Sequence, residues 1–144
     1  MKIKRNSSTA QLPFRASAGA AAFDLIADTI ELTPAGSKII INTGLSVAVP
    51  EGHALLIFSR SGQGFKHDVR LVNCVGVIDS DYRGPLMVKL TADGPHGIDY
   101  LMKIRQGDRI AQMILVQLPP MTIEEVDELD ETERGQNGLG STGS

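Results

Sequence analysis

The sequence predicts one all-β domain, built as a sandwich or barrel of short strands. Its 144 residues suit a single compact domain. The 15 glycines and 7 prolines separate short apolar runs, at intervals of about ten residues that are typical of such folds. No stretch of about 11 to 18 residues in the body has helical periodicity. We therefore expect an all-β body.

Alternation and turn residues predict the individual strands. Apolar residues alternate with small ones over 45–49, directly before a Pro-Glu-Gly turn at 50–52. The run 54–58 is apolar throughout, as expected of a strand buried on both faces. Apolar residues alternate again over 86–90, and 110–118 is rich in β-branched side chains before two prolines. Each of these segments is predicted to be a strand.

The C-terminal residues 122–144 differ in character from the body, residues 1–121. A capping box at 122–125, followed by apolar residues at helical spacing, favours a short acidic helix. The apolar stripe is thin, however, and the prolines before it fit a departing extended arm equally well. Local pattern alone leaves both alternatives open. The glycine-rich end, 134–144, is predicted to be a disordered terminus.

Charge and composition exclude several classes of protein. Residues 124–134 hold seven acids and one base, which leaves the rest of the chain at about +3 although the whole carries −3. This mild excess suits an anionic small molecule and is too weak for direct nucleic-acid binding. No apolar run reaches the roughly 20 residues of a membrane span, and the N-terminus is no secretory signal. A lone Cys74 excludes an internal disulfide and fits a reducing, cytoplasmic setting.

Three polar segments could carry chemistry. In 72–84, apolar residues flank an Asp-Ser-Asp-Tyr-Arg-Gly turn, which predicts a β-hairpin with a polar tip. Asp79 follows the apolar residues and is expected at the edge of the core. Two roles are open for its carboxylate: it could act as a general base, or it could close an Asx-turn. In 58–64, an Arg-Ser-Gly sequence offers a cation, hydroxyls and amides to a phosphate, or forms an ordinary turn. The glycine-rich end repeats these groups. The three histidines show no metal-ligand spacing.

Five blocks, in this order, resemble the five motifs of the trimeric dUTPases, the dUTP diphosphatases. The resemblance covers residues 18–143, nearly the whole chain. The blocks are 18–25 (AGAAAFDL), 59–62 (SRSG), 73–84 (NCVGVIDSDYRG), 107–113 (GDRIAQM) and 134–143 (RGQNGLGSTG).

The resemblance implies a β jelly roll, or distorted barrel, assembled as a homotrimer. Active sites would lie at subunit junctions, and 122–144 would be an extended arm closing a neighbouring subunit's site. The implied reaction is hydrolysis of dUTP to dUMP and pyrophosphate, which keeps uracil out of DNA and supplies dUMP for thymidylate synthesis. Mg²⁺ would be the cofactor, held mainly by the triphosphate and not directly by the protein.

The resemblance also implies a role for each site residue. Asp79 would activate the attacking water, and Asp24 would be a supporting residue. Tyr82 would pack on the deoxyribose and exclude a ribose. The base and sugar would be bound by Asn73, Gly76, Val77, Ile78, Tyr82, Met87 and Leu139. The phosphates would be bound by Arg60, Ser61, Gly62, Gln112, Arg134, Ser141 and Thr142.

The chain departs from the family pattern in the arm. Leu139 stands where the family has a phenylalanine that stacks on the uracil, and Gln136-Asn137 replaces the usual Glu-Gly. Two other functions stay open: a dUTP-binding regulatory protein of the same fold, and the related dCTP deaminase. The deaminase needs a catalytic glutamate, and the body's Glu31 and Glu51 are expected in turns.

Overall fold

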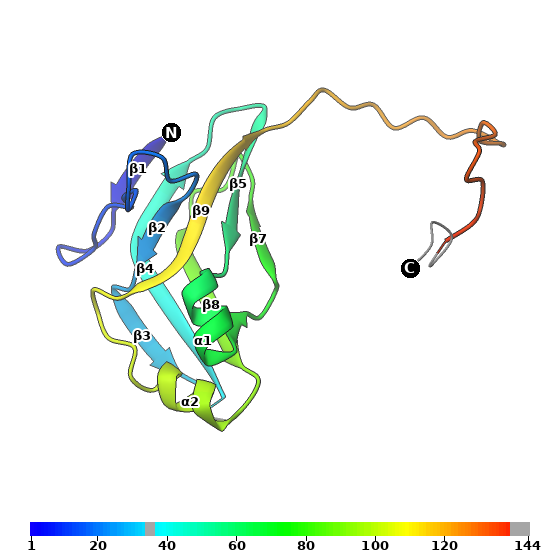
Figure 1. The fold of residues 1–144 in the computed structure, drawn as a ribbon. Coiled ribbons are helices and arrows are strands. Elements are labelled where there is room, and N and C mark those ends of the chain that lie inside the picture. The colour runs from blue at the N-terminus through cyan, green and yellow to red at the C-terminus, as the bar shows by residue number, and fades with distance from the viewer. Residues whose placement is uncertain (34–36, 139–144) are drawn as a thin grey trace.

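The computed structural model describes residues 1–33 and 37–138 and consists of two antiparallel sheets packed face to face (Figure 1). The first sheet has the order β1-β4-β8-β6, with β3 also paired to β4. The second has the order β2-β9-β5-β7. The all-β prediction is therefore confirmed in its main feature. The strands of the first sheet are β1 (Lys2–Arg5), β3 (Thr29–Leu32), β4 (Lys38–Ala48), β6 (Val69–Leu71) and β8 (Pro85–Ala92). Those of the second are β2 (Phe23–Ile26), β5 (His53–Phe58), β7 (Val75–Ile78) and β9 (Arg109–Gln117).

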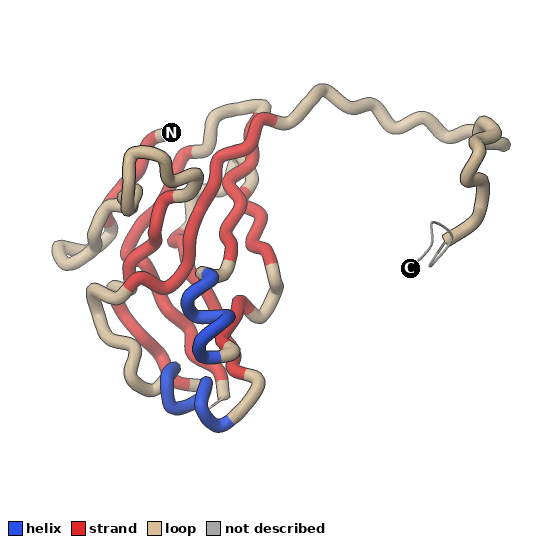
Figure 2. Tube along the Cα trace, viewed as in Figure 1, coloured by secondary structure: helices blue, strands red, loops and turns tan. Residues whose placement is uncertain are grey.

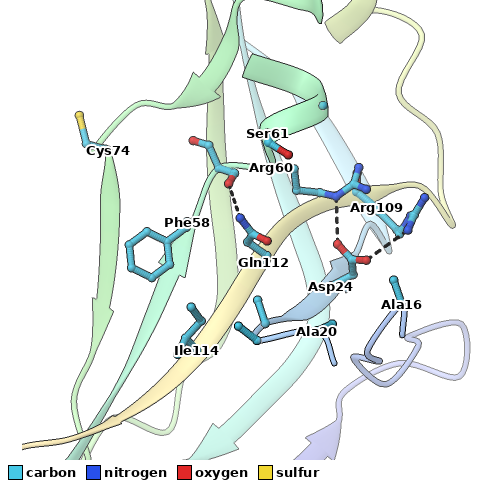
Figure 3. Close-up of a pocket in the computed structure, with 14 residues that line it drawn as sticks. Ala16, Ala20, Asp24, Phe58, Arg60, Ser61, Cys74, Arg109, Gln112 and Ile114 are labelled. Carbon is cyan, nitrogen blue, oxygen red and sulfur yellow. Dashed lines mark hydrogen bonds and ion pairs between the residues drawn. The ribbon is translucent and has the colours of Figure 1, made fainter. Parts of the chain in front are cut away.

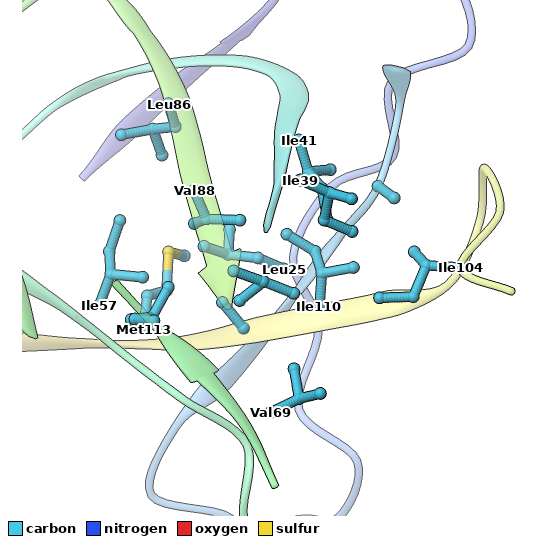
Figure 4. Packing of buried hydrophobic residues seen from close by; sticks show 14 of the residues in the cluster. Leu25, Ile39, Ile41, Ile57, Val69, Leu86, Val88, Ile104, Ile110 and Met113 are labelled. Carbon is cyan, nitrogen blue, oxygen red and sulfur yellow. The ribbon is translucent and has the colours of Figure 1, made fainter. Parts of the chain in front are cut away.

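The core lies between the two sheets, where the inward side chains interdigitate (Figure 4). Successive residues of a strand point to opposite faces, so each strand contributes every second side chain. Full burial of one Leu, Ile, Val or Met side chain stabilises a fold by about 1.5–3 kcal/mol. The second sheet contributes Leu25, Leu55, Ile57, Ile110 and Met113, and the first contributes Ile39, Ile41, Leu86, Val88 and Leu90.

Two short helices accompany the sheets (Figure 2). They are α1 (Ser61–His67) and α2 (Pro95–Leu101), each of seven residues. A helix of two turns is too short to show a periodic apolar face, so the sequence pattern missed both. Contact between them supports both helices, because the His67 ring stacks on Tyr100 with centroids 4.0 Å apart. Neither helix of the described chain has the length or apolar content to span a bilayer.

The predicted hairpin over 72–84 is wrong in its pairing. The strands on either side of the turn, β7 and β8, belong to different sheets: β7 pairs with β5, and β8 pairs with β4 and β6. The turn therefore crosses from one sheet to the other, and β7 stays at the edge of its sheet. Glu31, expected in a turn, lies in β3.

The C-terminal segment leaves the body as an extended arm (Figure 1). From 118 to 138 it contains neither helix nor strand, so the acidic helix that the capping box favoured does not form. Its apolar side chains contact little, and Ile123 and Leu129 are 86% and 84% exposed. Most of a helix's stability comes from packing of its apolar face, and the described part of the chain does not cover these side chains.

Candidate functional site

Strand register places two rows of side chains on opposite faces of the second sheet. Asp24, Gln112, Phe58 and Val75 lie opposite one another on β2, β9, β5 and β7. The next row includes Met113 and Ile57, which point into the core. The first row therefore points away from the core. In this way Asp24 and Gln112, which are 88 positions apart in the sequence, become neighbours on the outer face.

An ion-pair cluster forms around Asp24 (Figure 3). One carboxylate oxygen accepts from Nε of Arg60 at 2.9 Å, and the other accepts from Nη1 of Arg109 at 3.3 Å. Arg60 also donates to the backbone carbonyl of Arg109 at 3.2 Å. The Asp24 side chain is only 12% exposed, so the pairs are partly shielded from water. One carboxylate thus holds two guanidinium groups side by side, with a net positive charge.

These groups line a cavity of about 730 Å³ on the outer face of the second sheet. Ser61 and Gly62 border it in the first turn of α1, where backbone N–H groups have no partner within the helix. Gln112 lies on the same wall and donates from Nε2 to the Ser59 carbonyl at 2.9 Å. Two guanidinium groups, hydroxyls and free amides are the groups that bind phosphate. The cavity is therefore suited to a polyphosphate.

A second cavity, of about 430 Å³, lies between β7 and β8. It exists because these strands diverge into different sheets, which leaves one edge of β7 without a neighbouring strand. The backbone N–H and C=O groups along that edge can pair with a flat, hydrogen-bonding ring. A side chain at Gly76 would crowd the wall of this cavity, since its Cβ would lie 3.3 Å from the Cβ of Ile57. The predicted base-binding residues Asn73, Gly76, Val77, Ile78 and Met87 all line this cavity.

The loop from 79 to 84 follows directly after Ile78, which lines the second cavity. Neither Asp79 nor Tyr82 is itself among the described residues that line either cavity. Asp79 is exposed, which corrects the expectation that it lies at the edge of the core. Tyr82 is 40% exposed, and its hydroxyl donates to the Pro85 carbonyl at 3.1 Å. The general base expected from the sequence, Asp79, is thus the next residue after the wall of the second cavity.

The remaining predicted residues belong to the arm. The guanidinium of Arg134 donates to the carbonyls of Asn137 at 2.9 Å and Gly138 at 3.2 Å, within the arm and away from the body. Leu139, Ser141 and Thr142 lie outside the described residues. Arg109, at the start of β9, was not predicted to be a site residue. It lies within the fourth block, 107–113, and this position could have indicated a role in the site.

The described residues contain no group of three or more His, Cys, Asp or Glu side chains placed to hold a metal ion. Among the described residues, Asp24 is the one carboxylate that lines the larger cavity, and its oxygens are paired with two guanidinium groups. A cation in this cavity would have to obtain most of its ligands from a bound polyanion or from water.

The fold and the two cavities, one cationic and one beside a free strand edge, are features of a nucleotide-binding β protein. The chain belongs to the dUTPase family, whose model matches residues 8–143. It is 41% identical to a deoxyuridine 5'-triphosphate nucleotidohydrolase of Zymomonas mobilis, covering 99% of this chain and 97% of that one. It is 43% identical to the enzyme of that name from Arabidopsis thaliana, covering 99% and 82%.

Solved structures show the same fold. A dUTPase variant from Staphylococcus bacteriophage 80alpha, solved with dUpNHpp, superimposes with a TM-score of 0.84 at 26% identity, covering 99% of this chain and 98% of that one. Another structure of that dUTPase with dUpNHpp has a TM-score of 0.82 at 27% identity and the same coverage, and its description states that phage dUTPases control transfer of virulence genes. The expected family and the expected fold class are both confirmed.

Proposed function

We propose that this protein hydrolyses dUTP to dUMP and pyrophosphate. The main support for this proposal is the pair of cavities. One is cationic, because Asp24 pairs with both Arg60 and Arg109, and the other lies along the free edge of β7. Their chemistry matches the two ends of a nucleoside triphosphate. Membership of the dUTPase family specifies which nucleotide and which reaction.

The uracil occupies the cavity beside β7 in this proposal. The backbone of β7 pairs with the base edge, and Asn73 assists once its side chain leaves the carbonyl of Val75, to which it donates at 3.2 Å. Met87, on β8, forms the opposite wall. Tyr82 packs on the deoxyribose and fills the volume that a 2′-hydroxyl would need. Selection for dUTP would thus combine hydrogen bonds to the base with steric exclusion at the sugar.

The phosphates occupy the cationic cavity of another subunit. Ile57 and Phe58 are consecutive on β5 but line different cavities, so the cavities lie on opposite sides of this strand. One small nucleotide cannot enter both within a single chain. A homotrimer with shared sites resolves this, because the base of dUTP binds one subunit while Arg60, Ser61, Gly62 and Gln112 of the next bind its phosphates.

The arm completes the site over a neighbouring subunit. Its extended course and exposed apolar side chains leave it free to reach another chain (Figure 1). Arg134, Ser141 and Thr142 then bind the terminal phosphate, and Leu139 covers the base. Closure also removes bulk water from the reacting groups, which strengthens the electrostatic interactions there.

Asp79 serves as the general base in this mechanism. Its carboxylate takes a proton from a water whose oxygen forms a bond to the α-phosphorus, while the bond from the α-phosphorus to the bridging oxygen breaks and pyrophosphate leaves. The cations neutralise charge that develops on the phosphate oxygens. Mg²⁺, held mainly by the triphosphate, supplies further charge neutralisation when bound. Exposure of Asp79 in the free chain is consistent with a site that the substrate and the arm assemble.

Pyrophosphate release from dUTP, dCTP, dTTP and UTP, each with Mg²⁺, tests the proposal. Release from dUTP alone supports it. Ammonia release from dCTP would instead identify a deaminase.

A regulatory role is the second candidate, favoured by the description of the similar phage dUTPases as controlling transfer of virulence genes. Tight dUpNHpp binding without measurable turnover would support that role and overturn the proposed hydrolysis.

A further inference from the structure

The loop that carries Asp79 and Tyr82 is closed by its own hydrogen bonds. The amide of Tyr82 donates to the carbonyl of Asp79 at 3.3 Å. Nη1 of Arg83 donates to the carbonyls of Ser80 at 2.7 Å and Tyr82 at 2.8 Å. The Tyr82 hydroxyl then reaches past Gly84 to the carbonyl of Pro85 at 3.1 Å. The tyrosine ring is therefore folded back over the next part of its own chain.

Gly84 lies directly beneath that ring. A Cβ at this position would lie 2.4 Å from the Tyr82 hydroxyl oxygen, 2.6 Å from Cζ and 3.0 Å from Cε2. All three separations are too short for non-bonded heavy atoms. The backbone itself would accept a side chain, since Gly84 is not among the residues with a left-handed φ. The tyrosine ring is thus the obstacle to any larger residue here.

We propose that Gly84 is a positioning residue for sugar selection: its missing side chain lets the Tyr82 ring lie where it excludes a ribose. The inference rests on the proposed function of Tyr82 and adds the residue that determines where the ring lies. Gly84 has no side chain to touch the substrate, so it acts through Tyr82.

The site allows this idea to be tested without unfolding the protein. Tyr82 is 40% exposed, so its ring can swing into solvent and lose one exposed hydrogen bond rather than core packing. We expect Gly84→Ala to stay folded and to displace the ring. Gly94→Ala is the matched control, because no heavy atom lies within 4 Å of its Cβ and its φ of 179° is ordinary extended backbone.

The experiment compares wild type, Tyr82→Ala, Gly84→Ala, the double variant and Gly94→Ala. For each, the preference for deoxyribose is the ratio of the Kd of UpNHpp to that of dUpNHpp, measured by calorimetry, and the ratio of kcat/KM for dUTP to that for UTP. We expect Tyr82→Ala to reduce the preference at least tenfold and Gly84→Ala at least threefold. The double variant should match Tyr82→Ala within twofold, and Gly94→Ala should match wild type within twofold.

Ring signals of Tyr82 in NMR spectra give a readout independent of nucleotide. The chain has two tyrosines and no tryptophan, so a Tyr82→Phe spectrum assigns them. Gly84→Ala should shift the Tyr82 signals and leave those of Tyr100 in place.

Each unexpected result leads to a different conclusion. An unchanged preference in Gly84→Ala, or a double variant much worse than Tyr82→Ala, overturns the inference. An unchanged preference in Tyr82→Ala removes the sugar-selecting role of Tyr82, and the inference falls with it. Wild type that prefers dUpNHpp yet hydrolyses nothing contradicts the proposed hydrolysis alone, since the binding ratios still test Gly84.

Discussion

The Asp24 carboxylate accepts a hydrogen bond from Nε of Arg60 at 2.9 Å, and this pair joins β2 to the residue that precedes α1. The other oxygen of Asp24 is paired with Arg109 at the start of β9. Three elements distant in the sequence are therefore connected at a single carboxylate. The two guanidinium groups face the cavity because Asp24 holds them there (Figure 3).

Asp24→Asn should weaken nucleotide binding. An amide keeps one acceptor oxygen and no charge, so it cannot hold both arginines. We expect the Kd for dUpNHpp to rise about tenfold, which corresponds to about 1.4 kcal/mol. Asp93→Asn is the control: it removes an exposed pair with Arg70 that contributes little to stability, and it should leave the Kd unchanged. Equal Kd values for Asp24→Asn and wild type would contradict the role assigned to Asp24.

Asp79→Asn should lower turnover and spare binding. The amide has nearly the shape of the carboxylate but cannot take a proton from water. Loss of a general base lowers the rate by about 10²- to 10⁴-fold. The measurement is kcat for dUTP beside the Kd for dUpNHpp, with Asp81→Asn in the same exposed loop as control. If the kcat of Asp79→Asn lies within threefold of the wild-type value, Asp79 is not the general base.

Truncation after Glu133 should leave a folded body with little activity. The arm beyond this residue contributes nothing to the buried core of the described structure, so the free energy of unfolding should change by less than about 0.5 kcal/mol. Turnover should collapse because Arg134, Ser141 and Thr142 are lost. Chemical denaturation and a turnover assay check the two halves of this prediction. Full activity of the truncated chain would show that the arm is no part of the site.

Leu139→Phe should act in the opposite direction. A phenyl ring can stack on the uracil, which adds about 1 kcal/mol relative to an aliphatic side chain, or roughly fivefold in Kd. Titration of dUpNHpp into both chains measures the difference, and Leu139→Met, which keeps nearly the same side-chain volume and adds no ring, is the control. Equal affinity in all three would show that the arm does not cover the base.

Acid should weaken one specific connection in the body. The buried Asp28 accepts from Thr9 at 2.6 Å, Ser7 at 2.7 Å and Gln106 at 3.3 Å. The hydroxyls of Thr9 and then Ser7 lower the pKa of Asp28 below its usual 3.8, outweighing its desolvation. Stability from this group is therefore complete above pH 3.8 and is lost as the pH falls through the lower folded-state pKa.

Chemical denaturation of wild type and Asp28→Asn as a function of pH checks this. Wild type should be more stable at pH 7, by about 1–3 kcal/mol, as expected for hydrogen bonds to a charged group. The difference should shrink below pH 3.8. Asp127→Asn on the exposed arm is the control and should match wild type throughout. A difference that stays constant down to pH 2 would contradict the assignment.

Local pattern by itself predicted the end of β4, the strands β5, β8 and β9, and the polar segments of this protein, but not β1, β2, β3 or β6. Alternation at 86–90 and the β-branched run at 110–118 correspond to β8 and β9, because a half-buried strand imposes a period of two on its own residues. The sequence of the 59–62 block also predicted phosphate binding, because that function needs particular side chains close together in the chain. The family resemblance ordered these pieces and predicted the extended arm.

Tertiary structure alone decided which strands, helices and side chains lie beside one another. Nothing local shows that β7 and β8 enter different sheets, although this divergence opens the cavity between them. Helices α1 and α2 are supported by contacts with each other and with neighbouring strands, and the apolar residues of the arm are exposed in the described part of the chain. Asp24 meets Arg60 and Arg109 only through strand register. Propensity acts between near neighbours in the chain, whereas the sites depend on packing between segments that are far apart in it.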